Sequence, residues 1–271
     1  MEYLISTISD VTTEEENGDW EKLSYADRTA PLAAGHGMGL ELAEFCISDN
    51  MENSFADVLP HVEACAAAVK RKTLHAPYNE LYPQAIDPMI VEVARRRYDL
   101  TWTYCLRFGA EKMIAHANYV EALYYPSWFV SRHVEFWRRF LEDHPEPVTV
   151  CLENVMETGP ELMLDIVKRV DDPRLRLCLD VGHANLSDVA PEEWLKACAP
   201  WISHYHIHNN NGPVAGARRS QGDTHSALDQ GVIDMEGLLR LAERLTPDAT
   251  AAVESYEPER CVAWLKEKGF V

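Results

Sequence analysis

Three histidines on alternate positions mark the segment HYHIHNNN, which runs from His204 to Asn211. In an extended strand the side chains alternate between two faces, so all three imidazoles would point the same way. We expect the strand to end near Ile207 and predict His206 as a metal ligand. His204 would lie about 6.6 to 6.8 Å lower as a core histidine. His208 would begin a loop, where it would face substrate or orient a ligand.

Other predicted strands also end in side chains that can bind a cation: His75, His116, Glu153, Asp180 and Glu254. Nearby segments add His183 in LDVGH, where Gly182 allows a sharp turn, and the pair Asp223 and His225 in GDTHSALDQG. Neutral imidazoles and carboxylates together suit Zn²⁺, Mn²⁺, Fe²⁺ or Co²⁺. The sequence therefore predicts a divalent metal ion as cofactor, with zinc or manganese favoured and one to three ions per chain.

Short apolar runs alternate with longer amphipathic segments along the whole chain. The predicted strands cover residues 3–8, 39–45, 72–76, 112–116, 148–153, 175–180, 202–207 and 250–254. The predicted helices cover residues 20–36, 54–70, 87–109, 127–143, 159–169, 191–199, 234–246 and 257–268. Eight strand-helix repeats without a linker-like run predict a single (β/α)8 TIM-barrel domain over residues 1–271. A doubly wound sheet is the alternative, but its Gly-rich phosphate fingerprint is absent.

A barrel would bring the predicted ligands together, because active sites of this fold lie at the carboxyl ends of the strands. Alternation along the strands adds that Cys151 shares a face with Glu153, and Cys178 shares a face with Asp180. We expect the two thiols to fill the barrel layer beneath the two carboxylates.

The composition excludes several classes of protein. A net charge of −19 would repel a polyanion over most of the surface, which disfavours nucleic acid as a partner. The seven cysteines are scattered without a C-x-x-C pair, so we expect reduced and mostly buried thiols. No run of apolar residues predicts a membrane span and no secretory signal is recognisable, so a cytoplasmic location is expected.

The motifs LDVGHAN, CLENV, HYHIHNNN, DTHSALDQG and AVES together resemble the xylose isomerase-like barrels. This superfamily contains sugar phosphate isomerases and epimerases and the apurinic endonuclease IV group. The resemblance extends from LHAPY at His75 to AVES at Glu254, and the order of the motifs matches as well as their residues.

The two branches of the superfamily imply different metal sites. The epimerase branch implies one divalent ion held by four residues, with the two glutamates also serving as the acid/base pair: Glu153, Asp180, His206 and Glu254. The endonuclease IV branch implies a three-zinc cluster with nine ligands, and a fitting residue is present at every position: His75, His116, Glu153, Asp180, His183, His206, Asp223, His225 and Glu254.

Departures from the endonuclease pattern argue against a role in DNA repair. LHAPYNELYP lacks the H-x-S-Y-x-x-N signature of that branch, and IHNNNG lacks the acidic residue and the Lys or Arg of H-x-N-D-x-K. The segment VTTEEENGDWEK after the first predicted strand is acidic, whereas a loop that binds a duplex would carry basic and aromatic wedges.

Two functions are therefore predicted. The first is a sugar or sugar-phosphate isomerase, epimerase or related lyase, in which Glu153 and Glu254 exchange a proton with carbon on opposite faces of the substrate. The alternative is a multi-zinc phosphoesterase acting on a small phosphate ester. A barrel that binds a sugar without converting it is a third and weaker possibility.

Several side chains are predicted to contact the small-molecule partner. Tyr78 and Trp128 are aromatic residues near predicted strand ends, where they could stack on a sugar or simply pack a helix. Arg218 and Arg219 could bind a phosphate or carboxylate, or pair with surface acids. His208 completes this set. A homo-oligomer is compatible with the fold.

Overall fold

Eight parallel strands form a closed barrel in the computed structural model, which describes residues 1–13, 23–25, 28–216 and 218–271. Around the barrel the strand order is β1, β10, β9, β8, β7, β6, β5 and β4. The strands are β1 (Glu2–Ser6), β4 (Gly39–Leu42), β5 (Lys72–His75), β6 (Lys112–His116), β7 (Thr149–Glu153), β8 (Leu175–Asp180), β9 (Ile202–Ile207) and β10 (Thr250–Val253). The predicted TIM barrel is confirmed.

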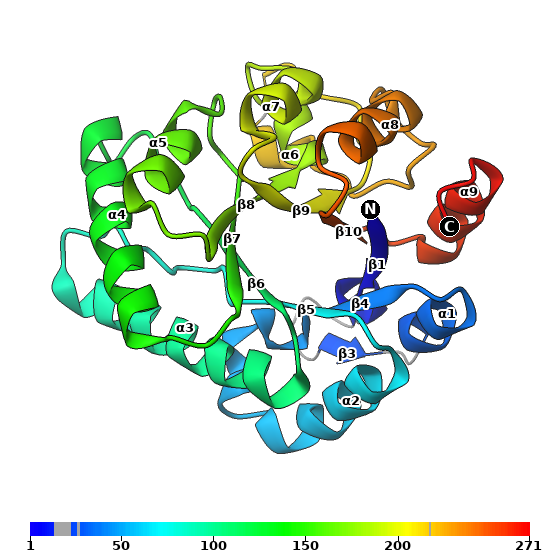
Figure 1. Ribbon diagram of the computed structural model, residues 1–271, viewed down its shortest axis with the longest axis horizontal. Helices are drawn as coiled ribbons and strands as arrows, with labels where there is room; N and C mark the ends of the chain where they lie inside the picture. The colour runs from blue at the N-terminus through cyan, green and yellow to red at the C-terminus, as the bar shows by residue number, and fades with distance from the viewer. Residues whose placement is uncertain (14–22, 26–27, 217) are drawn as a thin grey trace.

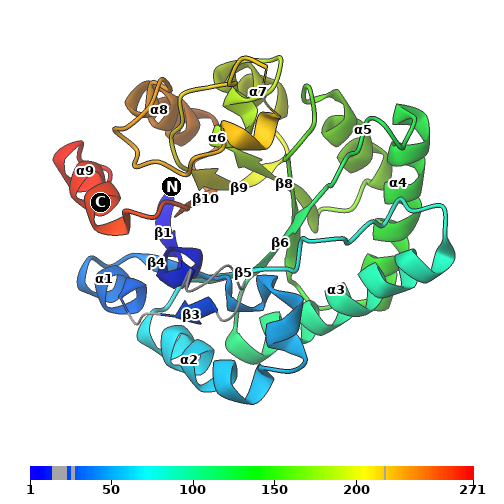
Figure 2. The same cartoon turned by 180° about the vertical axis from the view of Figure 1, so that it is seen from behind.

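Helices surround this ring of strands in both views along the barrel (Figures 1 and 2). They are α1 (Thr29–Gly35), α2 (Phe55–Ala68), α3 (Pro88–Phe108), α4 (Pro126–Asp143), α5 (Glu161–Val170), α6 (Val181–Asn185), α7 (Pro191–Cys198), α8 (Met235–Leu245) and α9 (Pro258–Glu267). Four short 3-10 turns are η1 (Thr7–Asp10), η2 (Glu44–Cys46), η3 (Ser48–Met51) and η4 (Arg219–Gln221). Among the described residues, no helix combines the length and the apolar character needed to cross a membrane.

Local sequence signals explain where several helices begin and end. Proline opens α3, α4, α7 and α9, where its missing N–H leaves no intrahelical bond unmade. Asp87 caps α3 by accepting a hydrogen bond from the amide of Met89 at 2.8 Å. The same helix ends at Gly109, whose φ of 68° is the left-handed conformation that glycine adopts without strain.

The predicted helix over residues 20–36 is wrong at its amino-terminal end. Residues 23–25 form a strand, β3 (Leu23–Tyr25), which pairs antiparallel with β2 (Val11–Thr13). Helix α1 begins only at Thr29, whose amide donates to both carboxylate oxygens of Asp10 at 3.2 Å. Residues 20–22 and 26–27 lie outside the described part of the chain, as does most of the acidic segment 11–22 that we singled out.

A second difference concerns the turn predicted at Gly182. The chain there forms a short helix, α6, that starts directly after β8. The predicted strand 39–45 is also shorter, because β4 ends at Leu42 and η2 follows. Both changes place ordered polar residues at the carboxyl end of the barrel.

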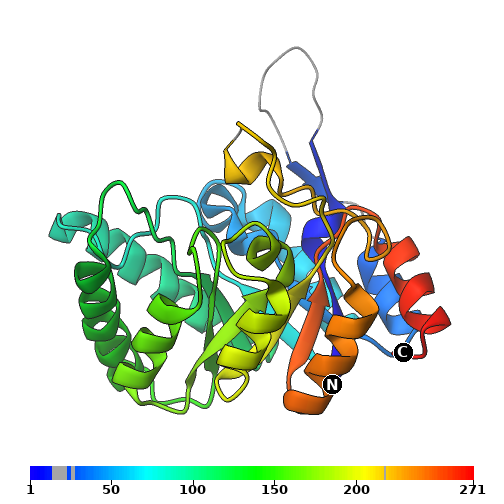
Figure 3. The same ribbon diagram turned by 90° about the horizontal axis from the view of Figure 1, so that it is seen from above.

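The interior of the barrel follows the predicted alternation. Ile114, Cys151 and Cys178 form a small buried cluster inside the ring, separate from the large core between strands and helices. Each thiol thus lies beneath the carboxylate of its own strand, Cys151 beneath Glu153 and Cys178 beneath Asp180, and all seven cysteines are free and buried, as expected. The long connection between β9 and α8 and the hairpin β2–β3 project from the same end of the molecule (Figure 3).

Candidate metal centre

The predicted ligands on β6 to β9 lie at the carboxyl ends of their strands, although Glu153 itself pairs in register with Cys178, two residues before Asp180. In the strand register His116 pairs with Glu153, and Asp180 pairs with His206. Glu254 directly follows β10, and its amide donates to the carbonyl of Ile207 at 3.2 Å. Parallel pairing thus assembles side chains from distant segments into one site.

An inner group of four residues surrounds one ring nitrogen. His206 Nδ1 lies 3.2 Å from Glu153 Oε2, 3.4 Å from Glu254 Oε2 and 3.9 Å from Asp180 Oδ2. The four side chains are buried. Among the described residues, neither His206 Nδ1 nor Glu153 Oε2 has a hydrogen-bond partner. Buried and unpaired atoms of this kind are costly, and a divalent cation among the three carboxylates would satisfy them.

A second group shares the same carboxylate oxygen. His75 Nε2 and His116 Nε2 lie 3.4 and 3.3 Å from Glu153 Oε2, with the two rings edge-to-face at 5.1 Å. His75 Nδ1 lies 2.7 Å from the carbonyl oxygen of Ala76. Since a carbonyl only accepts, Nδ1 carries the proton, and the Nε2 of a neutral ring keeps a lone pair for a cation.

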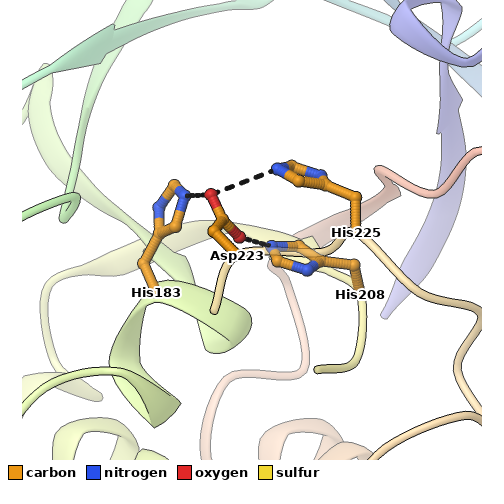
Figure 4. A group of neighbouring side chains, drawn as sticks. All are labelled: His183, His208, Asp223 and His225. Atoms are coloured by element: carbon orange, nitrogen blue, oxygen red, sulfur yellow. Dashed lines mark hydrogen bonds and ion pairs between the residues drawn. The ribbon is translucent and has the colours of Figure 1, made fainter. Parts of the chain in front are cut away.

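An outer group gathers around Asp223, whose carboxylate lies between three imidazoles (Figure 4). Asp223 Oδ2 is 3.1 Å from His183 Nε2 and 3.5 Å from His225 Nε2, while Oδ1 is 3.8 Å from His208 Nε2. The Nδ1 atoms of His183 and His225 each face a backbone carbonyl, of Asn154 at 2.9 Å and of Glu254 at 2.8 Å. Both histidines are therefore oriented, like His75, with Nε2 toward the candidate ion position.

Helix α6 and Asn154 fix the orientation of Asp180. Its Oδ1 accepts a hydrogen bond from the amide of His183 at 2.6 Å and thereby caps the helix. The side chain of Asn154 bonds both the amide and the carbonyl of Asp180, at 2.9 and 3.0 Å. His208 Nε2 lies 3.2 Å from each oxygen of the same carboxylate. The predicted role of His208 toward substrate or ligand stays a prediction.

Burial and neighbouring charges shift the pKa values of Glu153 and Glu254 in opposite directions. Burial alone would raise the pKa of Glu153, but His116 and His206 hold that pKa well below its ordinary value. Burial raises the pKa of Glu254, and the nearby carboxylates add to this effect. Burial would lower the pKa of His225, but Asp223 raises it to about 9. Carboxylates with unequal pKa values can take different roles in proton transfer.

Only some of the residues predicted to bind substrate are seen beside the candidate metal ligands. The ring of Tyr78 stacks on His116, with centroids 4.7 Å apart, so this tyrosine borders the ligand groups. Trp128 lies in the first turn of α4, where its Nε1 donates to the carbonyl of Gln84 at 2.8 Å. Arg218 is exposed in the long connection. The side chain of Arg219 lies outside the described part of the structure.

Three polar residues of the site were not predicted from the sequence. Glu41 on β4 is fully buried within reach of His204 and His206, Asn154 holds Asp180, and Asn209 holds the long connection. The signal for Glu41 was available, since a carboxylate in the middle of an apolar strand, GLELAEF, must find buried partners. His204, which we expected in the core, is fully buried, and burial lowers its pKa to about 4.

Comparison with known proteins identifies related sequences and folds. A family model described as xylose isomerase-like TIM barrel matches residues 32–268. An uncharacterised protein of Methanocaldococcus jannaschii is 24% identical over 193 residues, which cover 67% of this chain and 63% of the relative, so the match spans less than two thirds of that protein.

Solved structures share the fold over nearly the whole chain. A D-tagatose 3-epimerase-like protein has a TM-score of 0.73 at 19% identity and covers 100% of this chain and 97% of its own. The IOLI protein, crystallised with a zinc atom, has a TM-score of 0.71 at 16% identity over 99% and 94% of the two chains. A D-psicose 3-epimerase from Clostridium cellulolyticum H10, solved with D-tagatose, has a TM-score of 0.70 at 16% identity over 97% and 90%.

Proposed function

The chain belongs to the xylose isomerase-like TIM-barrel family, and from that premise we propose that it is a divalent-metal-dependent isomerase or epimerase of a small sugar or sugar phosphate. One observation carries the proposal: Glu153 at the end of β7 and Glu254 directly after β10 reach the same buried atom, His206 Nδ1, at 3.2 and 3.4 Å. The likeness in fold to sugar epimerases supports it.

In this proposal one glutamate accepts a proton from the substrate and the other donates a proton to it. One carboxylate removes the proton from the carbon next to a carbonyl, and the other returns a proton to the opposite face of that carbon. A bound divalent ion supplies Lewis-acid polarisation of the substrate oxygens. Glu153, Asp180, His206 and Glu254 are the residues that would hold it, and Tyr78 would contact the sugar.

The test is solvent exchange at carbon. We expect the metal-loaded protein, incubated in D2O with a panel of ketoses and ketose phosphates, to incorporate deuterium next to the carbonyl of its substrate, as measured by NMR. Glu153→Gln and Glu254→Gln should each lower kcat by about 10²- to 10⁴-fold. Glu161→Gln, at an exposed position of α5, is the matched control. Full turnover in both site variants would overturn the proposal.

A metal-dependent phosphoesterase is the second candidate, favoured by the ligand count. Nine candidate ligands form adjoining groups, and two or three ions could clamp a phosphoryl group between them. Metal content separates the candidates: about one ion per chain supports the isomerase, whereas two or three with hydrolysis of an aryl phosphate support the phosphoesterase. If His116→Ala keeps all metal and all activity, the multi-metal proposal fails.

A further inference from the structure

A chain of polar side chains crosses the barrel interior directly beneath the inner ligand group. We call it the axial network, and it consists of Lys112, Thr250, His204, Glu41 and Thr73. Its members come from β6, β10, β9, β4 and β5, and all are buried. Since a buried polar group is costly without partners, the donors and acceptors along this chain must match.

The direction of each hydrogen bond follows from Lys112, because an ammonium group can only donate. Lys112 Nζ lies 2.6 Å from the carbonyl oxygen of Ser203 and 2.9 Å from Thr250 Oγ1. Thr250 Oγ1 thus accepts from the lysine and can donate its own hydrogen to His204 Nδ1, 2.6 Å away. Nε2 of His204 lies 2.9 Å from Glu41 Oε2, and because a carboxylate oxygen only accepts, the ring carries its proton on Nε2 and accepts from Thr250 at Nδ1.

The carboxylate of Glu41 divides its two oxygens between two sets of partners. Oε2 accepts from His204 and from the hydroxyl of Thr73 at 2.9 Å. Oε1 lies 2.9 Å from His206 Nε2 and, among the described residues, has no hydrogen-bond partner by geometry. Nε2 of His206 likewise has no hydrogen-bond partner by geometry among the described residues, so these two buried atoms, 2.9 Å apart, satisfy each other when Nε2 carries the proton and the ring adjusts slightly.

We propose that Glu41 is a positioning residue that holds the proton of His206 on Nε2 and so makes Nδ1 the metal-binding atom. The inference rests on the proposed function, since it assumes a divalent ion among Glu153, Asp180 and Glu254. The lone pair of Nδ1 then points at these carboxylates, where it is favourable only with a cation between them. Glu41 contributes a negative charge close to this ion without contacting it, which strengthens the imidazole as a ligand.

The first experiment measures zinc affinity by competition with a chromophoric chelator. Glu41→Gln keeps the shape of the side chain, but its amide N–H₂ would face a ring N–H of His204 or His206. We expect one class of bound zinc to weaken roughly 10- to 100-fold, with any other zinc unchanged. Thr101→Val is the matched control, because it removes a buried hydroxyl within α3, outside the axial network; its zinc affinity should equal that of the wild type.

The second experiment needs no variant and remains decisive if Glu41→Gln fails to fold. A crystal structure of the zinc-loaded wild-type protein should show Nδ1 of His206 on the ion and Nε2 against Glu41. Zinc on Nε2, or wild-type affinity in Glu41→Gln, would overturn this inference alone. Wild-type protein that binds no zinc at the inner group would overturn the proposed function as well, so the two failures are distinguishable.

Discussion

Three histidines of the candidate centre are oriented by the same kind of contact, between Nδ1 and a backbone carbonyl. His75, His183 and His225 each direct Nδ1 at a backbone carbonyl, at 2.7, 2.9 and 2.8 Å, and so present Nε2 to the ligand groups. His206 differs from these three, because a carboxylate, Glu41, faces its Nε2 instead. The residue types are visible in the sequence, but the partner that selects each ring nitrogen is not.

At the scale of single residues, glycine is required at position 182 because a side chain there would clash with His208. A Cβ atom added there would lie 2.0 Å from Cε1 of His208, so the ring that approaches Asp180 would have to move. We expect Gly182→Ala to lower the free energy of unfolding by about 1–3 kcal/mol, the usual cost of overpacking. Urea unfolding measures this change.

Gly35→Ala provides the matched control, because nothing lies within 4 Å of its added Cβ and the position ends a helix. This variant should be neutral or more stable by up to about 1 kcal/mol. Equal losses of stability in the two variants would show that the space beside His208 is unimportant.

At the scale of elements, α4 is attached to the loop after β5 through a buried neutral histidine. His133 Nε2 lies 3.1 Å from Gln84 Oε1, and Nδ1 accepts from Trp137 Nε1 at 3.1 Å. Burial lowers the pKa of His133 to about 3. The folded protein thus resists protonation of a ring that an unfolded chain protonates near pH 6.5.

This depressed pKa predicts acid destabilisation. Stability from neutral His133 is fully present above pH 6.5 and is lost as the pH falls from there toward 3, by up to about 1.4 kcal/mol per pH unit. Urea unfolding of metal-free protein between pH 7 and 4 should show a shallower pH dependence for His133→Gln. The exposed His36 gives the control His36→Gln, which removes an imidazole without removing a buried one. Parallel curves for wild type and His133→Gln would contradict the prediction.

The side chain of Asn209 makes four hydrogen bonds that hold the long connection after β9. Asn209 Nδ2 donates to the carbonyls of Leu228 and Ile233 at 2.9 and 3.2 Å, and its Oδ1 accepts from the amides of Asn210 and Ile233 at 2.9 and 3.1 Å. These bonds join the start of the connection to its end and so position Asp223 between them.

Asn209→Ala would remove these four bonds from buried backbone groups, of which the carbonyl of Ile233 still accepts from the amide of Met235 at 2.8 Å. Because each such group costs about 1–3 kcal/mol, we expect a loss of more than about 2 kcal/mol in the free energy of unfolding, together with weaker metal binding by the outer group. Asn211→Ala, two residues away and exposed, should change stability by less than about 0.5 kcal/mol. Similar unfolding curves for both variants would exclude the anchoring role of Asn209.

At the scale of the whole molecule, the candidate centre connects strands from much of the barrel. Ligand groups come from β5 through β10 and from the long connection, so an ion bound there would stabilise the folded state as a unit. The carboxylates and the net charge of −19 add repulsion that a cation relieves.

Metal should therefore raise the melting temperature. Binding at 100 times the dissociation constant adds about 2.7 kcal/mol, which corresponds to a shift on the order of 5–10 °C for a chain of this size. Mn²⁺ is the better probe in calorimetry, because the seven cysteines of the unfolded chain would bind zinc. A melting temperature that is unchanged by Mn²⁺ and by chelator would contradict a metal site in the folded protein.

The sequence alone determined the barrel and the residue types of its mouth. Short apolar runs alternating with amphipathic segments indicated the fold, and imidazoles or carboxylates at six strand ends had to converge once the strands were parallel neighbours. Alternation also placed Cys151 and Cys178 beneath the carboxylates. Local pattern was misleading at residues 23–25, where pairing with β2 outweighed the helical periodicity.

Tertiary structure alone decided how each side chain is oriented. Glu41 meets His204 and His206 across more than 160 residues of sequence, and Asn154 meets Asp180 across a strand pair. Such contacts depend on the register and closure of the barrel, which bring together atoms that no spacing along the chain relates. For that reason HYHIHNNN could indicate a ligand, whereas only the folded barrel decides that Nδ1 of His206 faces the candidate ion.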